Sequence, residues 1–196
     1  MILHGSRLVS TALMLLLGGC SQGPLSSPQR ADANLSSNNS PFEITATIRE
    51  LMDSTVDPAA DGLWNSVASI SSKAGMEERQ PRSDEEWAAV RRHAVTLMES
   101  MNLVVMKGRH AAPPGTQAEE GELTPVEIEQ HIAANREALV SFAKALRASA
   151  QGALSAIDKK DVAGLFKSGG DIDEACESCH VVFWYPNQKV PTTLPQ

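Results

Sequence analysis

Residues 158–185, DKKDVAGLFKSGGDIDEACESCHVVFWY, decide which fold and function the sequence predicts. One set of residues in this stretch recurs at steps of three and four, which is the spacing of one helix face. The pattern crosses Gly169-Gly170 without a change of phase, although two interior glycines cost roughly 2 kcal/mol relative to alanine. We therefore expect one continuous helix to about Tyr185, with a bulky group close to the glycines; the alternative is a break into two short helices. The face consists of Leu165, Gly169, Ile172, Cys176, Cys179 and Phe183.

Residues 176–180, CESCH, carry the strongest chemical signal in the chain. Cysteines three apart on a helix share one face, so both thiols can add to the two vinyl groups of one heme. The histidine that follows can then ligate the iron, so C-x-x-C-H predicts covalent attachment of heme c. Three other interpretations stay open: a thioredoxin-like redox pair without its βαβ context, a zinc site without a visible second pair of ligands, and a strained disulfide within a helix.

Upstream, a first helical segment begins after residue 42, and its apolar residues keep their phase across Asp57-Pro58. A proline inside a helix costs about 3 kcal/mol, so we expect a kink there, or a restart with Asp57 as N-cap and Pro58 as the first helical residue. The face of this segment consists of Ile44, Ile48, Met52, Val56, Ala59, Leu63, Val67 and Ile70.

Two further segments carry helix-start signals. Ser83 with Glu86, and Thr124 with Glu127, match the capping-box pattern, and a Pro- and Gly-rich loop separates the two segments. We expect each of them to form one helix, the third helix reaching residue 149, and we see no strand signals. Together the four segments predict an all-α domain, an antiparallel up-down-up-down four-helix bundle with covalent heme near the C-terminal end of the fourth helix.

The composition agrees with a single helical domain of residues 43–186. Of the 196 residues, 42% are hydrophobic and only 4% aromatic, and three cysteines are too few for a disulfide scaffold. The net charge of −7 argues against a nucleic-acid-binding surface. Trp64 and Trp87 are expected to fill the core or the wall of a heme site.

A heme motif near the end of the last helix of a four-helix bundle resembles the class II c-type cytochromes, the cytochrome c prime superfamily. The resemblance covers residues 43–185, and its specificity comes mostly from the CESCH motif and its position. It implies that Cys176 and Cys179 carry the thioether bonds and that His180 is the proximal axial ligand of the iron.

The resemblance also implies that a residue on the first helix sets the sixth position of the iron. An apolar residue there leaves five-coordinate iron that binds NO or CO, whereas a methionine gives six-coordinate iron suited to electron transfer. Met52 lies about where the ligating methionine of this family falls, so it is the candidate sixth ligand. Methionines in a bundle are more often core residues, so an open site stays the alternative. Weaker candidates are Met98, Met101, Met106, His93, His110 and His131.

The first 20 residues, MILHGSRLVSTALMLLLGGC, are typical of an export signal. Arg7 supplies a basic start, and the apolar stretch of residues 8–17 is too short to span a bilayer. The ending Leu-Gly-Gly-Cys resembles a bacterial lipobox, which predicts a lipoprotein signal peptide at residues 1–19 and acylation of Cys20. An ordinary secretory peptide is the alternative.

Residues 20–42 are rich in Ser, Asn and Pro, so they predict a flexible tether between membrane and domain. Acyl chains on Cys20 would hold the protein at a bacterial membrane from the periplasmic side. Ser21 follows the cysteine where an Asp usually signals retention at the inner membrane, so the outer membrane is slightly favoured. Residues 187–196 form a C-terminal tail.

These features predict a membrane-tethered periplasmic monoheme cytochrome that carries single electrons to and from redox partner proteins. A five-coordinate NO- or CO-binding protein is the alternative, and a lipoprotein adaptor with a structural heme is a third hypothesis. The sequence shows no Ser-His-Asp set, phosphate loop or paired carboxylates, so we expect no enzymatic activity. The resemblance is also compatible with a homodimer. The acidic runs that could steer a basic partner are Glu77-Glu78, Asp84-Glu85-Glu86 and Glu119-Glu120.

Overall fold

The computed structural model describes residues 43–73 and 75–187. The predictions on the signal peptide, the tether and Cys20 lie outside these residues, as does the tail from residue 188 on. The described chain is mostly helical, as expected, with one small two-stranded sheet. No helix in the described ranges is long and apolar enough to cross a membrane. The elements are α1 (Ile48–Leu51), the π-helical turn η1 (Met52–Val56), α2 (Asp57–Trp64), β1 (Ala68–Ser72), β2 (Gly75–Arg79), α3 (Asp84–Val104), α4 (Pro125–Ala134), α5 (Arg136–Asp158) and α6 (Val162–Phe183).

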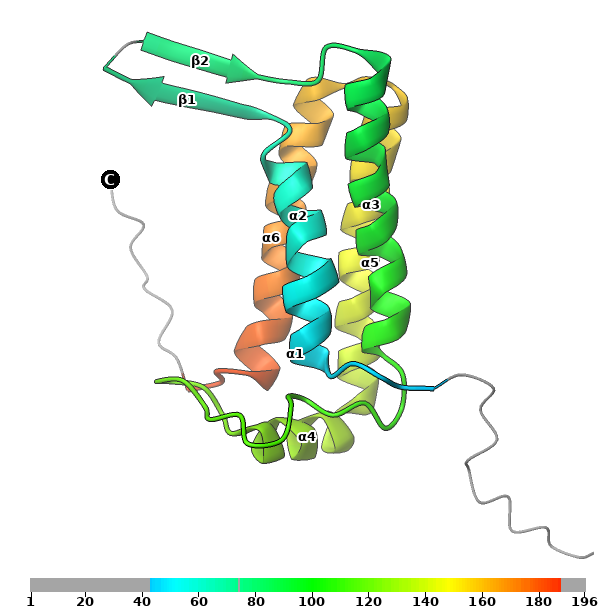
Figure 1. Ribbon diagram of the computed structural model, residues 1–196, viewed down its shortest axis with the longest axis vertical. Coiled ribbons are helices and arrows are strands. Elements are labelled where there is room, and N and C mark those ends of the chain that lie inside the picture. Colours follow the sequence, from blue (N-terminus) through cyan, green and yellow to red (C-terminus); the bar gives the residue numbers. More distant parts are fainter. Residues whose placement is uncertain (1–42, 74, 188–196) are drawn as a thin grey trace, which may run out of the picture. The chain divides into compact units, whose positions relative to one another are not determined.

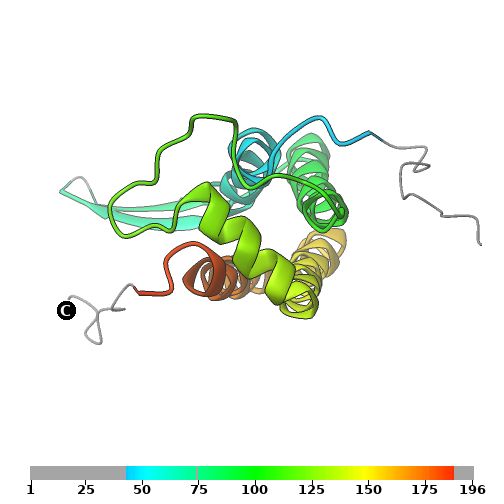
Figure 2. The same ribbon diagram turned by 90° about the horizontal axis from the view of Figure 1, so that it is seen from below.

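Four helical rods lie side by side (Figure 1). The segments α1, η1 and α2 form the first rod, and α3, α5 and α6 are the other three. Helix α5 packs closely against both α3 and α6, whereas the first rod contacts α6 much less than it contacts α3. Helix α4 crosses one end of the rods (Figure 2). The completely buried side chains between the rods include Leu63, Leu97, Ala150, Ala153, Leu165 and Ile172.

The first rod begins with a capping box that the sequence analysis did not identify. The Thr47 side chain accepts a hydrogen bond from the amide of Glu50, and the Glu50 carboxylate accepts one from the Thr47 amide. The rod then continues through Pro58 with helical backbone angles, and the Asp57 amide donates to the Met52 carbonyl, an i to i−5 bond. The predicted restart with Asp57 as N-cap is therefore wrong. The wider π turn directly precedes the proline and accommodates it without ending the helix.

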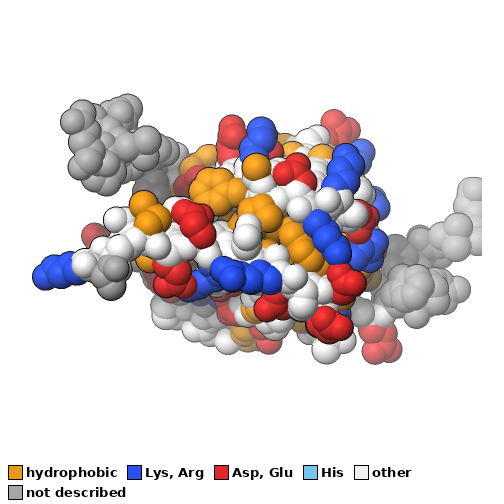
Figure 3. Space-filling model, turned by 90° about the horizontal axis from the view of Figure 1, so that it is seen from above, with side chains coloured by type: hydrophobic (Ala, Val, Ile, Leu, Met, Phe, Trp, Pro, Cys, Tyr) orange, Lys and Arg blue, Asp and Glu red, His pale blue; other side chains and the backbone are white. Residues whose placement is uncertain are grey.

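The first rod ends at Trp64, not at Ile70. Residues 68–72 and 75–79 pair as antiparallel strands in which Ile70 faces Glu77, so the expectation of helix to Ile70 and the absence of strand signals were both wrong. Gly75 opens the second strand with φ of 125°, which glycine adopts without steric cost. The hairpin projects from one end of the rods, where hydrophobic side chains appear among acidic and basic ones (Figure 3).

Helix α3 starts as predicted, with Ser83 and Glu86 forming a capping box. Thr124 and Glu127 form the same motif at the start of α4. The predicted third helix is interrupted at Asn135, whose φ of −124° and ψ of 40° leave the helical region. Its side-chain amide donates to the His131 carbonyl at 3.0 Å, a local bond by which asparagine competes with helix continuation.

Helix α6 is continuous across Gly169-Gly170, as the phase of the pattern predicted, and ends at Phe183. The indole nitrogen of Trp64 donates to the Gly169 carbonyl at 2.9 Å. A Cβ on Gly169 would lie 3.1 Å from Trp64 Cδ1, whereas a Cβ on Gly170 would meet nothing within 4 Å. The expected bulky neighbour is thus Trp64, and it explains the first glycine only.

Candidate functional site

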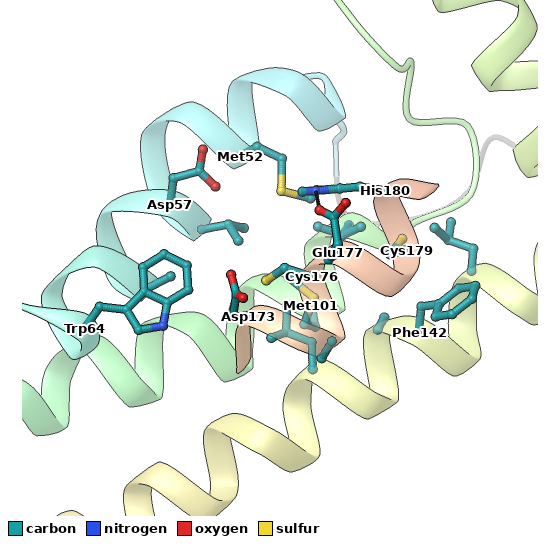
Figure 4. A pocket seen from close by; sticks show the side chains of 17 residues that line it. Met52, Asp57, Trp64, Met101, Phe142, Asp173, Cys176, Glu177, Cys179 and His180 are labelled. Carbon is teal, nitrogen blue, oxygen red and sulfur yellow. Dashed lines mark ion pairs between the residues drawn. The ribbon is translucent and has the colours of Figure 1, made fainter. Parts of the chain in front are cut away.

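A cavity of about 170 Å³ lies among the four rods near the CESCH motif (Figure 4). Every rod contributes side chains to its wall, and most of them are apolar. Polar groups come from Asp57 on α2 and from Asp173, Glu177 and His180 on α6. The apolar wall consists of Val56, Ala60, Trp64, Met101, Val104, Leu139, Phe142, Ala143, Leu146 and Ala175.

The three residues that the motif singles out all line this one cavity. Cys176, Cys179 and His180 reach it from the last turns of α6, since positions three and four apart share a helix face (Figure 4). Both thiols are free and partly buried. The site therefore combines two thiols and an imidazole on one side with apolar walls on the others.

Both thiols have raised pKa values because they are buried. Burial raises the pKa of Cys176 to about 11, and the carboxylates of Asp173, Asp57 and Glu177 add to the effect. It also raises the pKa of Cys179 to about 12, with a smaller contribution from the neighbouring Cys176. A reactive redox pair needs a lowered thiol pKa, so the thioredoxin-like interpretation loses support. Within residues 43–73 and 75–187, no group of three or more His, Cys, Asp or Glu side chains could hold a metal ion, so nothing favours the zinc interpretation either.

His180 lies among side chains from its own helix end. Its Nδ1 atom is 4.0 Å from Oε2 of Glu177, one turn earlier. Its ring centroid is 6.2 Å from that of Trp184 and 6.0 Å from that of Tyr185. With Nδ1 next to a carboxylate, Nε2 is the nitrogen that remains to bind a metal at the cavity.

Met52 reaches the cavity from the opposite side, on the first rod. It also lines a smaller neighbouring cavity together with His180, and its side chain points toward the imidazole (Figure 4). Met52 is the first residue of the π turn η1. An inserted π turn changes the helical register, and such turns frequently occur at functional sites. Met52 and His180 thus line the same two cavities.

Among the other methionines, Met101 on α3 also lines the cavity and is 4% exposed. Met98 belongs to the hydrophobic core of the helical rods. Met106 lies in the loop after α3, where its sulfur accepts a hydrogen bond from Arg109 at 3.4 Å. Met101 is therefore the one rival to Met52 in this set.

The three histidines proposed as weaker candidates do not line this cavity. The ring of His93 packs against Gly62, where an added Cβ would lie 2.4 Å from it. His110 pairs with Glu129 at 3.0 Å in the region of α4. His131 is exposed on α4.

The acidic groups at the edge of the cavity were not predicted from the sequence. Asp57 was interpreted as a helix cap, yet its pKa is raised by burial and by the neighbouring Asp53 and Asp61. The spacing of these three residues, four apart, was the signal that they share one side of the first rod. Asp173 precedes Cys176 by three positions and so reaches the same cavity from α6.

The donor set fits a covalently bound heme. Two free thiols three residues apart match two vinyl groups, and His180 and Met52 would offer a nitrogen and a sulfur to the iron. An engineered cavity of about 150 Å³ holds one benzene molecule, so a cavity of about 170 Å³ holds only part of a macrocycle. Among the rods that pack against each other, the first rod and α6 have the least contact, so these two elements would have to separate to admit the rest.

Comparison of the chain with models of protein families, with curated proteins and with solved structures gives no match.

Proposed function

We propose that the protein is a monoheme c-type cytochrome that transfers single electrons and has no enzymatic activity. In this proposal the four rods are an antiparallel up-down-up-down four-helix bundle, and heme c is attached to Cys176 and Cys179. His180 is one axial ligand and Met52 the other. The protein is tethered at a bacterial membrane, the outer one slightly favoured, through acylated Cys20 and faces the periplasm.

One observation carries this proposal: both thiols, His180 and Met52 line a single, largely apolar cavity. Bound heme would supply reversible one-electron chemistry at the iron. The chain's own residues do the rest. The thiols hold the group covalently, His180 and Met52 set its axial environment, and the apolar wall limits the access of water. A methionine sulfur as ligand raises the reduction potential and blocks the position that a gas would use.

The alternative function is the binding of NO or CO at five-coordinate iron. It is favoured by the fact that Met52 is only partly buried on a π turn, so it is not locked among core residues. In that case Met52 would be a wall residue, and the cavity side facing the first rod would receive the gas.

The visible and near-infrared spectra of the matured protein test both functions, with Met52→Leu and Met101→Leu as a matched pair. We expect a sharp reduced α-band that CO leaves unchanged in the parent protein and in Met101→Leu. In Met52→Leu we expect the methionine–iron band to disappear and CO to bind, because leucine has no donor atom.

If the parent protein shows a high-spin spectrum that shifts with CO, the alternative function, gas binding at five-coordinate iron, is supported instead. A loss of the band in Met101→Leu alone would assign the sixth ligand to α3. Absence of any heme spectrum in protein matured in the periplasm would refute both functions.

A further inference from the structure

The carboxylate of Glu177 lies next to the imidazole of His180, one helical turn earlier on α6. The distance from Oε2 to Nδ1 is 4.0 Å (Figure 4, dashed line). This is an ion-pair distance, longer than a hydrogen bond. The His180 side chain is 35% exposed, so a small movement of the imidazole toward the carboxylate can shorten this distance.

A second residue fixes the Glu177 carboxylate from the other side. The hydroxyl of Tyr185 donates a hydrogen bond to the same Oε2 atom at 2.7 Å. The hydroxyl is the donor in this bond, since a carboxylate only accepts. Tyr185 is itself anchored because its amide bonds to the His180 carbonyl at 3.1 Å, and the adjacent Trp184 carbonyl accepts from Leu123 at 2.7 Å. The position of the carboxylate is thus set by the chain beyond α6.

We propose that Glu177, held by Tyr185, is a positioning residue that accepts a hydrogen bond from Nδ1–H of His180 and so keeps Nε2 directed toward the cavity. The inference rests on the proposed heme attachment. A histidine that ligates a metal commonly donates its other ring N–H to a carboxylate, which fixes the tautomer and makes the ring a stronger ligand. Glu177 occupies the first variable position of the C-x-x-C-H motif, so this partner is built into the attachment sequence itself.

A negative charge on the hydrogen-bond acceptor favours the more positive, oxidised iron, so Glu177 lowers the reduction potential. A second carboxylate, that of Asp57 on the first rod, also interacts electrostatically with His180. Removal of Glu177 alone therefore leaves the Asp57 carboxylate near the ligand, so the effects of the two carboxylates on the reduction potential can be measured separately.

The test compares Glu177→Gln with Glu174→Gln in the heme-loaded protein. Glu174 is exposed on the same helix, three positions before Glu177, so its replacement removes the same charge from the same helix face. We measure the midpoint reduction potential by spectroelectrochemistry. We also measure the iron–histidine stretching frequency of the reduced protein in a Met52→Leu background, where the sixth position is open.

We expect Glu177→Gln to shift the potential upward and the stretching frequency downward, and Glu174→Gln to move both much less. Equal shifts in the two variants would overturn the inference and leave the proposed function intact. Should Glu177→Gln fail to mature, Glu177→Asp keeps the charge on a shorter side chain, and a potential at the parent value would then overturn the inference. Absence of covalent heme from the parent protein would overturn the proposed function together with it.

Discussion

Burial determines the chemistry of the two thiols before any group is attached to them. The pKa of Cys176 rises from its ordinary value of 9.0 to about 11, because the surrounding side chains and nearby carboxylates disfavour the thiolate. In the proposed function each thiol would add to its own vinyl group, so only the heme-free protein would contain both thiols in this protonated form. A raised pKa is the opposite of what redox exchange needs, because the thiolate is the reactive species.

Alkylation of the heme-free protein by iodoacetamide tests this difference. At pH 8 the raised pKa lowers the thiolate population about 100-fold, so Cys176 should react about 100-fold more slowly in the folded protein than in urea. The rate in the folded protein should continue to increase until pH 11. Mass spectrometry of the labelled peptides gives the rate for each cysteine, and a plateau below pH 9 would contradict the assignment.

The same shift has a consequence for stability, with a definite sign. The unfolded thiol ionises first, near pH 9, while the folded one stays protonated until about pH 11. Between these values the unfolded state binds fewer protons, so the free energy of unfolding falls as the pH rises, by about 1.4 kcal/mol per unit for each such thiol. Well below pH 9 the thiol is protonated in both the folded and the unfolded state, so its contribution to the pH dependence of stability is absent.

At the scale of the helix, Gly169 and Gly170 provide a matched pair on α6. Replacement of Gly170 by alanine should raise the free energy of unfolding by about 1 kcal/mol, because its Cβ meets nothing within 4 Å and alanine favours the helix. Replacement of Gly169 should bring no gain or a loss. Its Cβ would press against Trp64, which a hydrogen bond holds in place.

Urea unfolding of both glycine variants, followed by circular dichroism, measures the difference. The Gly170 variant is the control, since it receives the same added methyl group on the same helix. An equal gain in both variants would mean that Trp64 moves freely, and the close contact would then not explain the first glycine.

Periodicity and capping signals predicted the helix starts at Ser83 and Thr124 and the continuity of α6, because each depends on local contacts within a few residues. They failed at the end of the first rod. Ile70 matched the helical spacing by coincidence, since a single apolar residue among serines fits the period of a helix and that of a strand. Gly75, with its positive φ, favours the turn into the second strand. The π turn could not be predicted either, as it follows from the way Pro58 is accommodated in three dimensions.

At the scale of the whole molecule, the motif residues were predictable and their surroundings were not. The spacing of Cys176, Cys179 and His180 is a local property of one helix. The cavity requires side chains from all four rods. Its acidic groups, Asp57 and Asp173, come from two different rods, so their proximity depends on how α2 and α6 pack. Packing between distant segments sets these features, and no short stretch of sequence encodes them.

The cavity also predicts that the attached group should stabilise the domain. An unfilled apolar cavity destabilises a domain because the side chains of its wall lose packing contacts. We expect the heme-loaded protein to have a higher free energy of unfolding than the heme-free protein in urea unfolding followed by circular dichroism. The heme-free sample is the same chain produced without the maturation machinery, so no substitution confuses the comparison. Equal free energies of unfolding would mean that the attached group does not fill the cavity. The assignment of Val104, Leu139 and Phe142 as the wall of its site would then be wrong.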